Sequence, residues 1–535
     1  MAIAPLLLAG VAALAPPGES PKIEVVKHTL KNGLRLLVVE RPDSPTVSTQ
    51  LRFLVGGVDD PKGETGIAHL LEHMMFKGSE TMGIVDREKE KPLLDRLDVL
   101  WAALDAERER QGSPFATPDP EKIRGIQKEI EMVSAEHRSL VVKDELWQAY
   151  QRVGGQRLNA STNDDATQYY VDLPKNQLEM WAYFEADRLA NPVFREFYSE
   201  RDVVHEERRL RTDTQPQGKF QEAMATLAHP AHPYRNPVVG WPSDIDGLSR
   251  AEVLEYFKTF YAPNNCIVAL VGDVKAAEAI ALVEKTFGSI PAKAQPRRRI
   301  TEEPPMEGER RLKMKLDAAP QVAISWPAVA TGHPDAPALS VAARVLTGSG
   351  GFGGGGGRGR FGGGGGGTGR FYKRLVDPPG GEGVAIAAFA MHRGGRYPGV
   401  FAATATPAPG QDLAVVEEAL GAEVERLAKE PPAEEELARV RNALDASWVR
   451  SLDSNAGIAG AILQAEALAG DWSWWLRERE LTKAVTAPDV ARVVEKYLRR
   501  DTRCVGWLEG TREDRPGRRA RPSEAAAPAR EGGVR

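Results

Sequence analysis

Apolar and polar residues alternate in two long blocks of the chain, each of which combines strand and helix patterns. In the first block, residues 33–40 and 46–57 have the short apolar runs of strands, and Asn32-Gly33 is typical of a hairpin turn. Further elements are expected as helices at 65–78, 175–190, 198–228, 249–260 and 275–287, and as strands at 168–173 and around Cys266. The first block therefore predicts an α+β unit.

The second block follows the same order of elements. Strand patterns come first, a helix at 334–346 takes the place of the helix at 65–78, and a strand around Cys504 takes the place of that around Cys266. The helix at 334–346 contains neither His nor Glu. We therefore predict two homologous α+β domains, residues 22–290 and 309–512, joined by a proline-rich linker at 291–308.

Residues 86–142 depart from this pattern and read as a charged helical hairpin inserted in the first domain. Leucines recur at helical spacing from Leu93 to Leu104, and isoleucines and a valine do so from Ile123 to Val133. The loop between them, residues 111–120, is rich in proline and polar residues. Such an insertion leaves its surroundings intact if its two ends lie close together.

The helix at 65–78 carries the pattern His69-Leu70-Leu71-Glu72-His73, and Thr65 is its expected N-cap. Residues four apart on a helix share a face, so both imidazoles can reach one zinc ion. Glu72 lies on the same side but offset, where it could contact a water on the metal without being a ligand. The alternative is a pair of core histidines with no metal.

A third ligand is expected on another element. Glu200 and Glu207 lie two helical turns apart in FYSERDVVHEERRLRTD and therefore share one face of their helix. The alternative is that this face is simply exposed to solvent, as is common for charged helices. Together, H-x-x-E-H and the downstream E-R-x-x-V-x-x-E resemble the pitrilysin-type inverzincins, the family of insulin-degrading enzyme and mitochondrial processing peptidase. The resemblance implies one Zn²⁺ per chain, with Glu207 as third ligand and Glu200 as a supporting carboxylate. Glu206 is the neighbour that could be confused with Glu207.

The same resemblance implies two α/β-sandwich domains that enclose a cleft, the second of them inactive. It implies a zinc metalloendopeptidase that hydrolyses peptides or unfolded polypeptides, with Glu72 as general base. A strand edge in the cleft would pair with the substrate, and Asn159 and Ala160 would hold its backbone. An ordinary edge strand is the alternative for these two residues. For the whole chain the alternative is a non-catalytic or weakly active scaffold subunit of a peptidase-like heterodimer.

Active members of the family carry an Arg and a Tyr in the second half that bind the substrate carbonyl. The register of the segment 370–375 puts these positions at Val376 and Gly383. We therefore expect a homologous, zinc-less partner subunit to supply the Arg/Tyr pair, or otherwise a homodimer. If the glycine-rich loop at 348–369 shifts this register, Tyr372, Arg374 or Arg396 would take the role instead.

Composition and the chain ends complete the expectations. The net charge of −5 over 535 residues gives no electrostatic case for binding nucleic acid. Residues 1–20 begin with an apolar run that is too short for a stable membrane span and resembles a signal peptide, although Pro16 follows the small-residue end directly. We expect export to the periplasm or cell envelope, otherwise a cytoplasmic protein. Residues 513–535 have the composition of a disordered tail.

Overall fold

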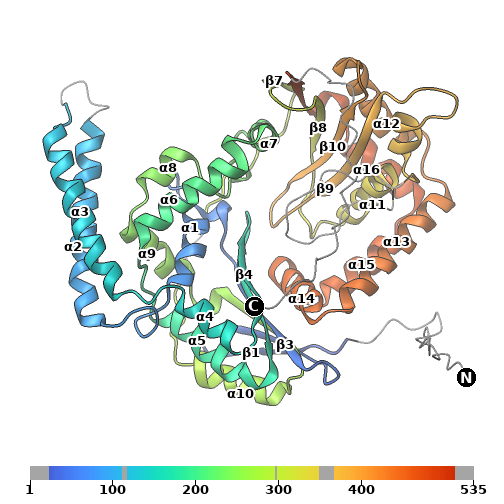
Figure 1. Cartoon of the computed structure of the whole chain (residues 1–535). Coiled ribbons are helices and arrows are strands. Elements are labelled where there is room, and N and C mark those ends of the chain that lie inside the picture. Colours follow the sequence, from blue (N-terminus) through green and yellow to red (C-terminus); the bar gives the residue numbers. More distant parts are fainter. Residues whose placement is uncertain (1–22, 111–116, 296–297, 349–366, 512–535) are drawn as a thin grey trace, which may run out of the picture.

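The structure is a computed structural model that describes residues 23–110, 117–295, 298–348 and 367–511 (Figure 1). The expected signal peptide, most of the glycine-rich loop and the expected disordered tail lie outside the described residues. Within them, none of the helices has the length and apolar composition needed to cross a membrane.

The first half is built on a six-stranded mixed sheet with the order β1-β2-β6-β3-β5-β4. Its strands are β1 (Val26–Thr29), β2 (Arg35–Glu40), β3 (Thr46–Phe53), β4 (Gln156–Thr162), β5 (Thr167–Pro174) and β6 (Cys266–Gly272). Strand β6 runs parallel to β2, and the other neighbours are antiparallel. The edge strand β4 adds to the expected elements, because only 168–173 of this region was predicted as a strand. The turn is confined to the short segment between β4 and β5.

The second half repeats this arrangement in a five-stranded sheet with the order β7-β11-β8-β10-β9. Its strands are β7 (Arg310–Leu316), β8 (Gln321–Pro327), β9 (Ala385–Arg393), β10 (Val400–Pro407) and β11 (Cys504–Gly510). Strand β11 is parallel to β7 and antiparallel to β8, just as β6 is parallel to β2 and antiparallel to β3. The equivalence of the strands around Cys266 and Cys504 thus holds in three dimensions.

Helices of each half cover one face of that half's own sheet. The first half contains α1 (Ile67–Met74), α4 (Glu145–Arg152), α5 (Leu178–Ala190), α6 (Phe197–Arg208), α7 (Pro216–Ala228), α8 (Pro242–Gly247), α9 (Arg250–Phe260) and α10 (Ala276–Phe287). The second contains α11 (Ala336–Thr347), α12 (Leu413–Lys429), α13 (Glu434–Leu452), α14 (Asn455–Ala469), α15 (Trp474–Ala484) and α16 (Ala487–Tyr497). In β2, Leu36 and Val38 face the core formed with the first set of helices.

The opposite face of each sheet is covered by one helix from the other half. Leu37 and Val39 of β2 and the alternate residues of β6 pack against Ile458 and Ile462 of α14. In return, Phe220 of α7 packs against the second sheet. Two helices are therefore exchanged between the halves, and the central strands of both sheets, such as β6 and β8, are covered on both faces. This explains why β6 is apolar along its whole length.

The insertion forms two antiparallel helices, α2 (Arg87–Glu109) and α3 (Pro120–Leu140), which stand beside the rest of the first half (Figure 1). The leucines of α2 and the isoleucines of α3 make a small core of their own. A β-bridge between Ile84 and Val141 joins the two ends of the insertion. The chain can therefore leave and return without displacing the elements on either side.

We expect Ile462→Ala to destabilise the protein by about 2–5 kcal/mol, the usual range for truncating a buried isoleucine. Ile462 is fully buried at 0% exposure on the far side of the first sheet. Thermal unfolding followed by circular dichroism measures the effect, and Ile386→Ala is the matched control because Ile386 is 57% exposed. Equal melting temperatures for the two variants would contradict the exchanged-helix packing.

Candidate metal centre

The N-terminus of α1 is held by an acidic side chain that sequence reasoning missed. Gly66 is the N-cap, with φ of 91°, and the carboxylate of Asp60 accepts hydrogen bonds from the backbone N–H groups of Gly66 and Ala68 at 2.8 and 3.3 Å. Thr65 was expected in this role, but its hydroxyl donates to Asp244 at 2.7 Å. The expectation was wrong because a side chain six residues upstream reaches the helix end across a short turn.

Three side chains from two helices converge beside α1. His69 and His73 lie on one face of α1, with ring centroids 4.9 Å apart. On α6, Glu207 places Oε2 3.6 Å from His69 Nε2 and 3.3 Å from His73 Nε2. One ligand atom from each residue lies within 4.8 Å of the others, and in the described part of the chain no other group of three His, Cys, Asp or Glu does so. Two imidazoles and one carboxylate are a usual donor set for zinc with an open position.

Glu200 lies behind this group. Its Oε2 is 3.3 Å from His73 Nδ1, on the ring nitrogen that faces away from Glu207, and its Oε1 is 2.5 Å from Lys77 Nζ. A carboxylate on the outer nitrogen orients an imidazole and makes it a better metal ligand. His69 has no equivalent partner, since its Nδ1 is buried without a hydrogen bond.

The protonation of the three residues shows that the cluster favours a cation. Burial, followed by the nearby His73, lowers the pKa of His69 to about 4. Burial would also lower the pKa of His73, but hydrogen bonds with Glu200 and Glu207 outweigh it and raise the pKa to about 9. Burial would raise the pKa of Glu207, but His73 and His69 lower it to about 2. A proton on His73 thus balances the carboxylates, a role that a metal ion can take over.

Glu72 lies apart from these three residues and is held by the edge strand. Its Oε2 accepts a hydrogen bond of 2.5 Å from the hydroxyl of Thr162 at the end of β4. Glu72 is 8% exposed, and burial raises its pKa despite this bond. A carboxylate with a raised pKa is suited to accept and return a proton near neutral pH. No spacing in the sequence singles out Thr162, because it reaches Glu72 only when β4 lies along α1.

Asn159 and Ala160 lie in the middle of β4, three and two residues before Thr162. They pair with Tyr170 and Tyr169 of β5. The backbone N–H of Ala160 donates to the side-chain oxygen of Asn159 at 2.8 Å. Both residues are therefore on the sheet edge that adjoins the cluster, which is where the predicted contact with a substrate backbone would have to be made.

The residues considered for the Arg/Tyr pair differ in their surroundings. Arg374 forms ion pairs with Glu423 and Glu430 of the second half. Only Arg396 is bound to the first half: its backbone N–H donates to Asp165 at 2.8 Å, and its guanidinium donates to the carbonyl of Asp165. These contacts hold Arg396 at the turn between β4 and β5, so its guanidinium is already engaged there.

Comparisons with known proteins agree with this arrangement. Residues 35–87 match the insulinase family, peptidase family M16, and residues 247–444 match the peptidase M16 inactive domain. The chain is 25% identical over 448 residues to the zinc protease PqqE of Helicobacter pylori, with 82% of each protein covered. It is 24% identical over 277 residues to a probable mitochondrial-processing peptidase subunit beta of Schizosaccharomyces pombe, covering 51% of this chain and 47% of that protein.

The crystal structure of a protease from Helicobacter pylori superimposes with a TM-score of 0.71 at 23% identity, covering 91% of this chain and 99% of that one. The fold is thus that of the two-domain M16 peptidases, in which one domain is the inactive copy. Both family models that match the chain are thus models of the M16 peptidases, the family that its sequence motifs resemble.

We expect Glu207→Gln to lower the zinc content of the purified protein strongly, because a neutral amide replaces the carboxylate that faces both imidazoles. Metal analysis after dialysis measures this. Glu206→Gln is the matched control, since Glu206 is exposed and pairs with Arg209 alone. Loss of zinc from the Glu206 variant only would show that the wrong carboxylate has been assigned.

Proposed function

We propose that the protein is a zinc-dependent metalloendopeptidase that hydrolyses peptides or unfolded polypeptides in the cleft between its halves. The observation that carries the proposal is the convergence of His69, His73 and Glu207, with Glu72 beside them as a separate, buried carboxylate. In this proposal the first three residues hold one Zn²⁺, and Glu200 orients His73. The relatives named zinc proteases support the same class of activity.

The reaction follows from the positions of these residues. Bound zinc would supply Lewis acidity, activating a water and polarising the scissile carbonyl. Glu72 takes the proton from the attacking water and returns it to the leaving amine. Thr162 fixes the carboxylate by donating to one oxygen, which leaves the other free for the proton. Burial raises the pKa of Glu72, which favours its part in both transfers.

The substrate would bind as an additional strand on β4. In the described residues β4 pairs with β5 and with no other strand, so its outer edge can accept the backbone of an extended peptide. Asn159 and Ala160 lie on this edge and would hold the peptide backbone. Because main-chain hydrogen bonds carry little sequence information, this mode suits unfolded polypeptides of varied sequence.

Glu72→Gln should abolish hydrolysis of a quenched fluorescent peptide while zinc stays bound, because the amide cannot accept the proton of the water. Activity and metal content of the same preparation are measured together. Loss of zinc along with activity would make Glu72 a ligand and refute its role as base. Full activity of the variant would refute the proposed mechanism.

A second candidate function is a weakly active subunit that needs a partner. Val376 and Gly383 stand where an Arg and a Tyr are expected, and neither residue has a side chain that can donate a hydrogen bond to a substrate carbonyl. Arg396 is engaged by Asp165, and Arg374 by Glu423 and Glu430. In this version a homologous, zinc-less subunit in the cell envelope supplies the missing pair; a homodimer is the alternative.

The chain alone should therefore be slow, since losing one oxyanion donor typically costs about 10²–10³ in rate. Peptide hydrolysis by the purified chain is compared before and after addition of the product of a neighbouring homologous gene. A rise of this order supports the heterodimer. Full activity of the chain alone, unchanged by the added subunit, contradicts it.

A further inference from the structure

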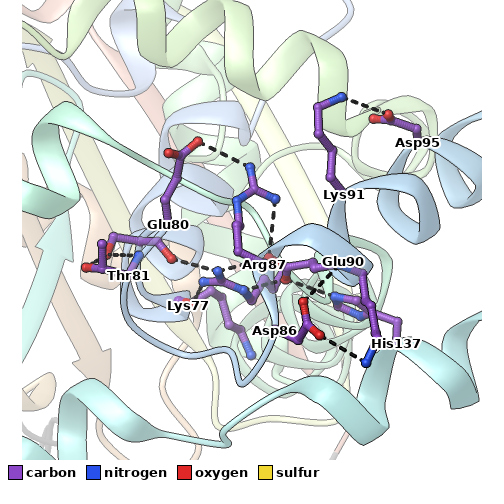
Figure 2. A network of polar contacts seen from close by, with 12 residues as sticks. Lys77, Glu80, Thr81, Asp86, Arg87, Glu90, Lys91, Asp95 and His137 are labelled. Atoms are coloured by element: carbon purple, nitrogen blue, oxygen red, sulfur yellow. Dashed lines mark hydrogen bonds and ion pairs between the residues drawn. The ribbon is translucent and has the colours of Figure 1, made fainter.

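A buried ion pair is one of the contacts that tie the helical insertion to the rest of the first half, beside the pair of Asp98 with Arg250 and the stacking of Trp101 on Tyr198. Arg195, the second residue before α6, is 0% exposed, and so is Glu90 of α2. The Nε and Nη2 groups of Arg195 donate to the two carboxylate oxygens of Glu90 at 2.5 and 3.0 Å. His137 of α3 contacts the same carboxylate at 3.2 Å, so both inserted helices take part (Figure 2).

The other N–H groups of Arg195 bind the segment that follows α1. They donate to the carbonyl oxygens of Lys77, Ser79 and Met82 at 3.1, 2.6 and 2.8 Å. All five guanidinium N–H groups therefore have acceptors. One side chain thus joins three elements: the insertion, the chain leaving α1, and the start of α6.

The same segment continues to the metal centre. The Lys77 side chain reaches Glu196 at 3.2 Å and Glu200 at 2.5 Å, and Glu200 contacts His73. Glu196, next to Arg195, has a φ of 54°, a left-handed conformation that is unfavourable for a residue other than glycine. Fixed contacts on both of its sides hold this conformation, and α6 begins directly after it. Its position decides where Glu207 lies relative to α1.

We propose that Arg195 and Glu90 are a positioning pair, through which the inserted hairpin sets α6, and with it Glu207 and Glu200, against the histidines of α1. The proposal rests on the proposed function, since it assigns a purpose to the same metal centre. The insertion is then part of the catalytic architecture. Removing the carboxylate would leave the Arg195 charge buried without its partner, and the guanidinium would move towards other acceptors.

The hairpin supplies a matched control. Glu107 is also on α2 and 1% exposed, but within the described residues its polar contacts are with the hairpin itself, Lys122 and the backbone of Asp119 among them. Glu90→Gln and Glu107→Gln thus remove one buried hairpin carboxylate each. Of these two carboxylates, Glu90 is the one that binds Arg195, two residues before α6.

The test uses the full-length chain loaded with zinc or with cobalt(II), whose visible absorption reports ligand geometry. Glu90→Gln should weaken zinc binding, by no more than the about 10–100-fold that follows from losing a direct partner of a ligand, because Glu90 acts through Arg195. It should also change the cobalt spectrum at saturating metal. Glu107→Gln should leave both unchanged and lower only the melting temperature. If Glu90→Gln does not fold, the double variant Glu90→Gln/Arg195→Gln, which removes both charges, replaces it.

The proposal is overturned if Glu90→Gln keeps the wild-type zinc affinity and cobalt spectrum and loses only thermal stability, as expected of Glu107→Gln. The proposal would also be overturned if the cobalt spectrum of His69→Ala were the same as that of the wild-type protein, because the metal would then lie elsewhere. A cobalt spectrum that responds to both His69→Ala and Glu90→Gln, in a protein without peptidase activity, would refute the proposed function and leave the positioning pair supported.

Discussion

The two halves depend on each other because each sheet has a second apolar face that its own helices do not cover. Helix α14 buries the far face of the first sheet, and α7 buries that of the second. The exchange requires close approach: a Cβ at Gly506 of β11 would lie 2.3 Å from the sulfur of Met224 and 3.0 Å from the ring of Phe220. Since a π-helical turn, Arg209–Asp213, continues α6 and leads into α7, this packing also restrains the helix that carries Glu207.

Polar contacts complete the junction at two places. Glu466 of α14 is fully buried and binds Lys27 and Arg35 from the first sheet at 2.8 and 3.0 Å. At the other place, Asp165 in the turn between β4 and β5 binds Arg396 of the second half and the hydroxyl of Tyr234. That turn immediately follows Thr162. A displacement of the second half would therefore also displace the end of β4, whose Thr162 binds Glu72.

Sequence reasoning succeeded where one local pattern determines the outcome. The duplication and the hairpin insertion follow from periodicity, and the shared face of His69 and His73 follows from their spacing. Glu207 was implied only by the resemblance to the inverzincins, and the structure places it beside both imidazoles. Sequence reasoning failed where distant residues meet. Asp60 replaces Thr65 at the end of α1, and β4 was not predicted as a strand because its polar, half-exposed residues lack an apolar alternation. Thr162 and Arg195 carry no local signal at all, since their contacts form only after folding.

Within the described residues the second half has no counterpart of the candidate metal cluster, and its core shows why. Helix α11 occupies the place of α1, and its first turns present Ala338, Val341 and Ala342, which are 3%, 2% and 0% exposed. These small apolar residues pack into the second core, where an unliganded imidazole or carboxylate would be costly. In the first half the same cost at His69 and Glu72 is offset by Glu207 and Thr162. Burial of polar groups in α1 is thus tolerated because α6 and β4 bring partners to it.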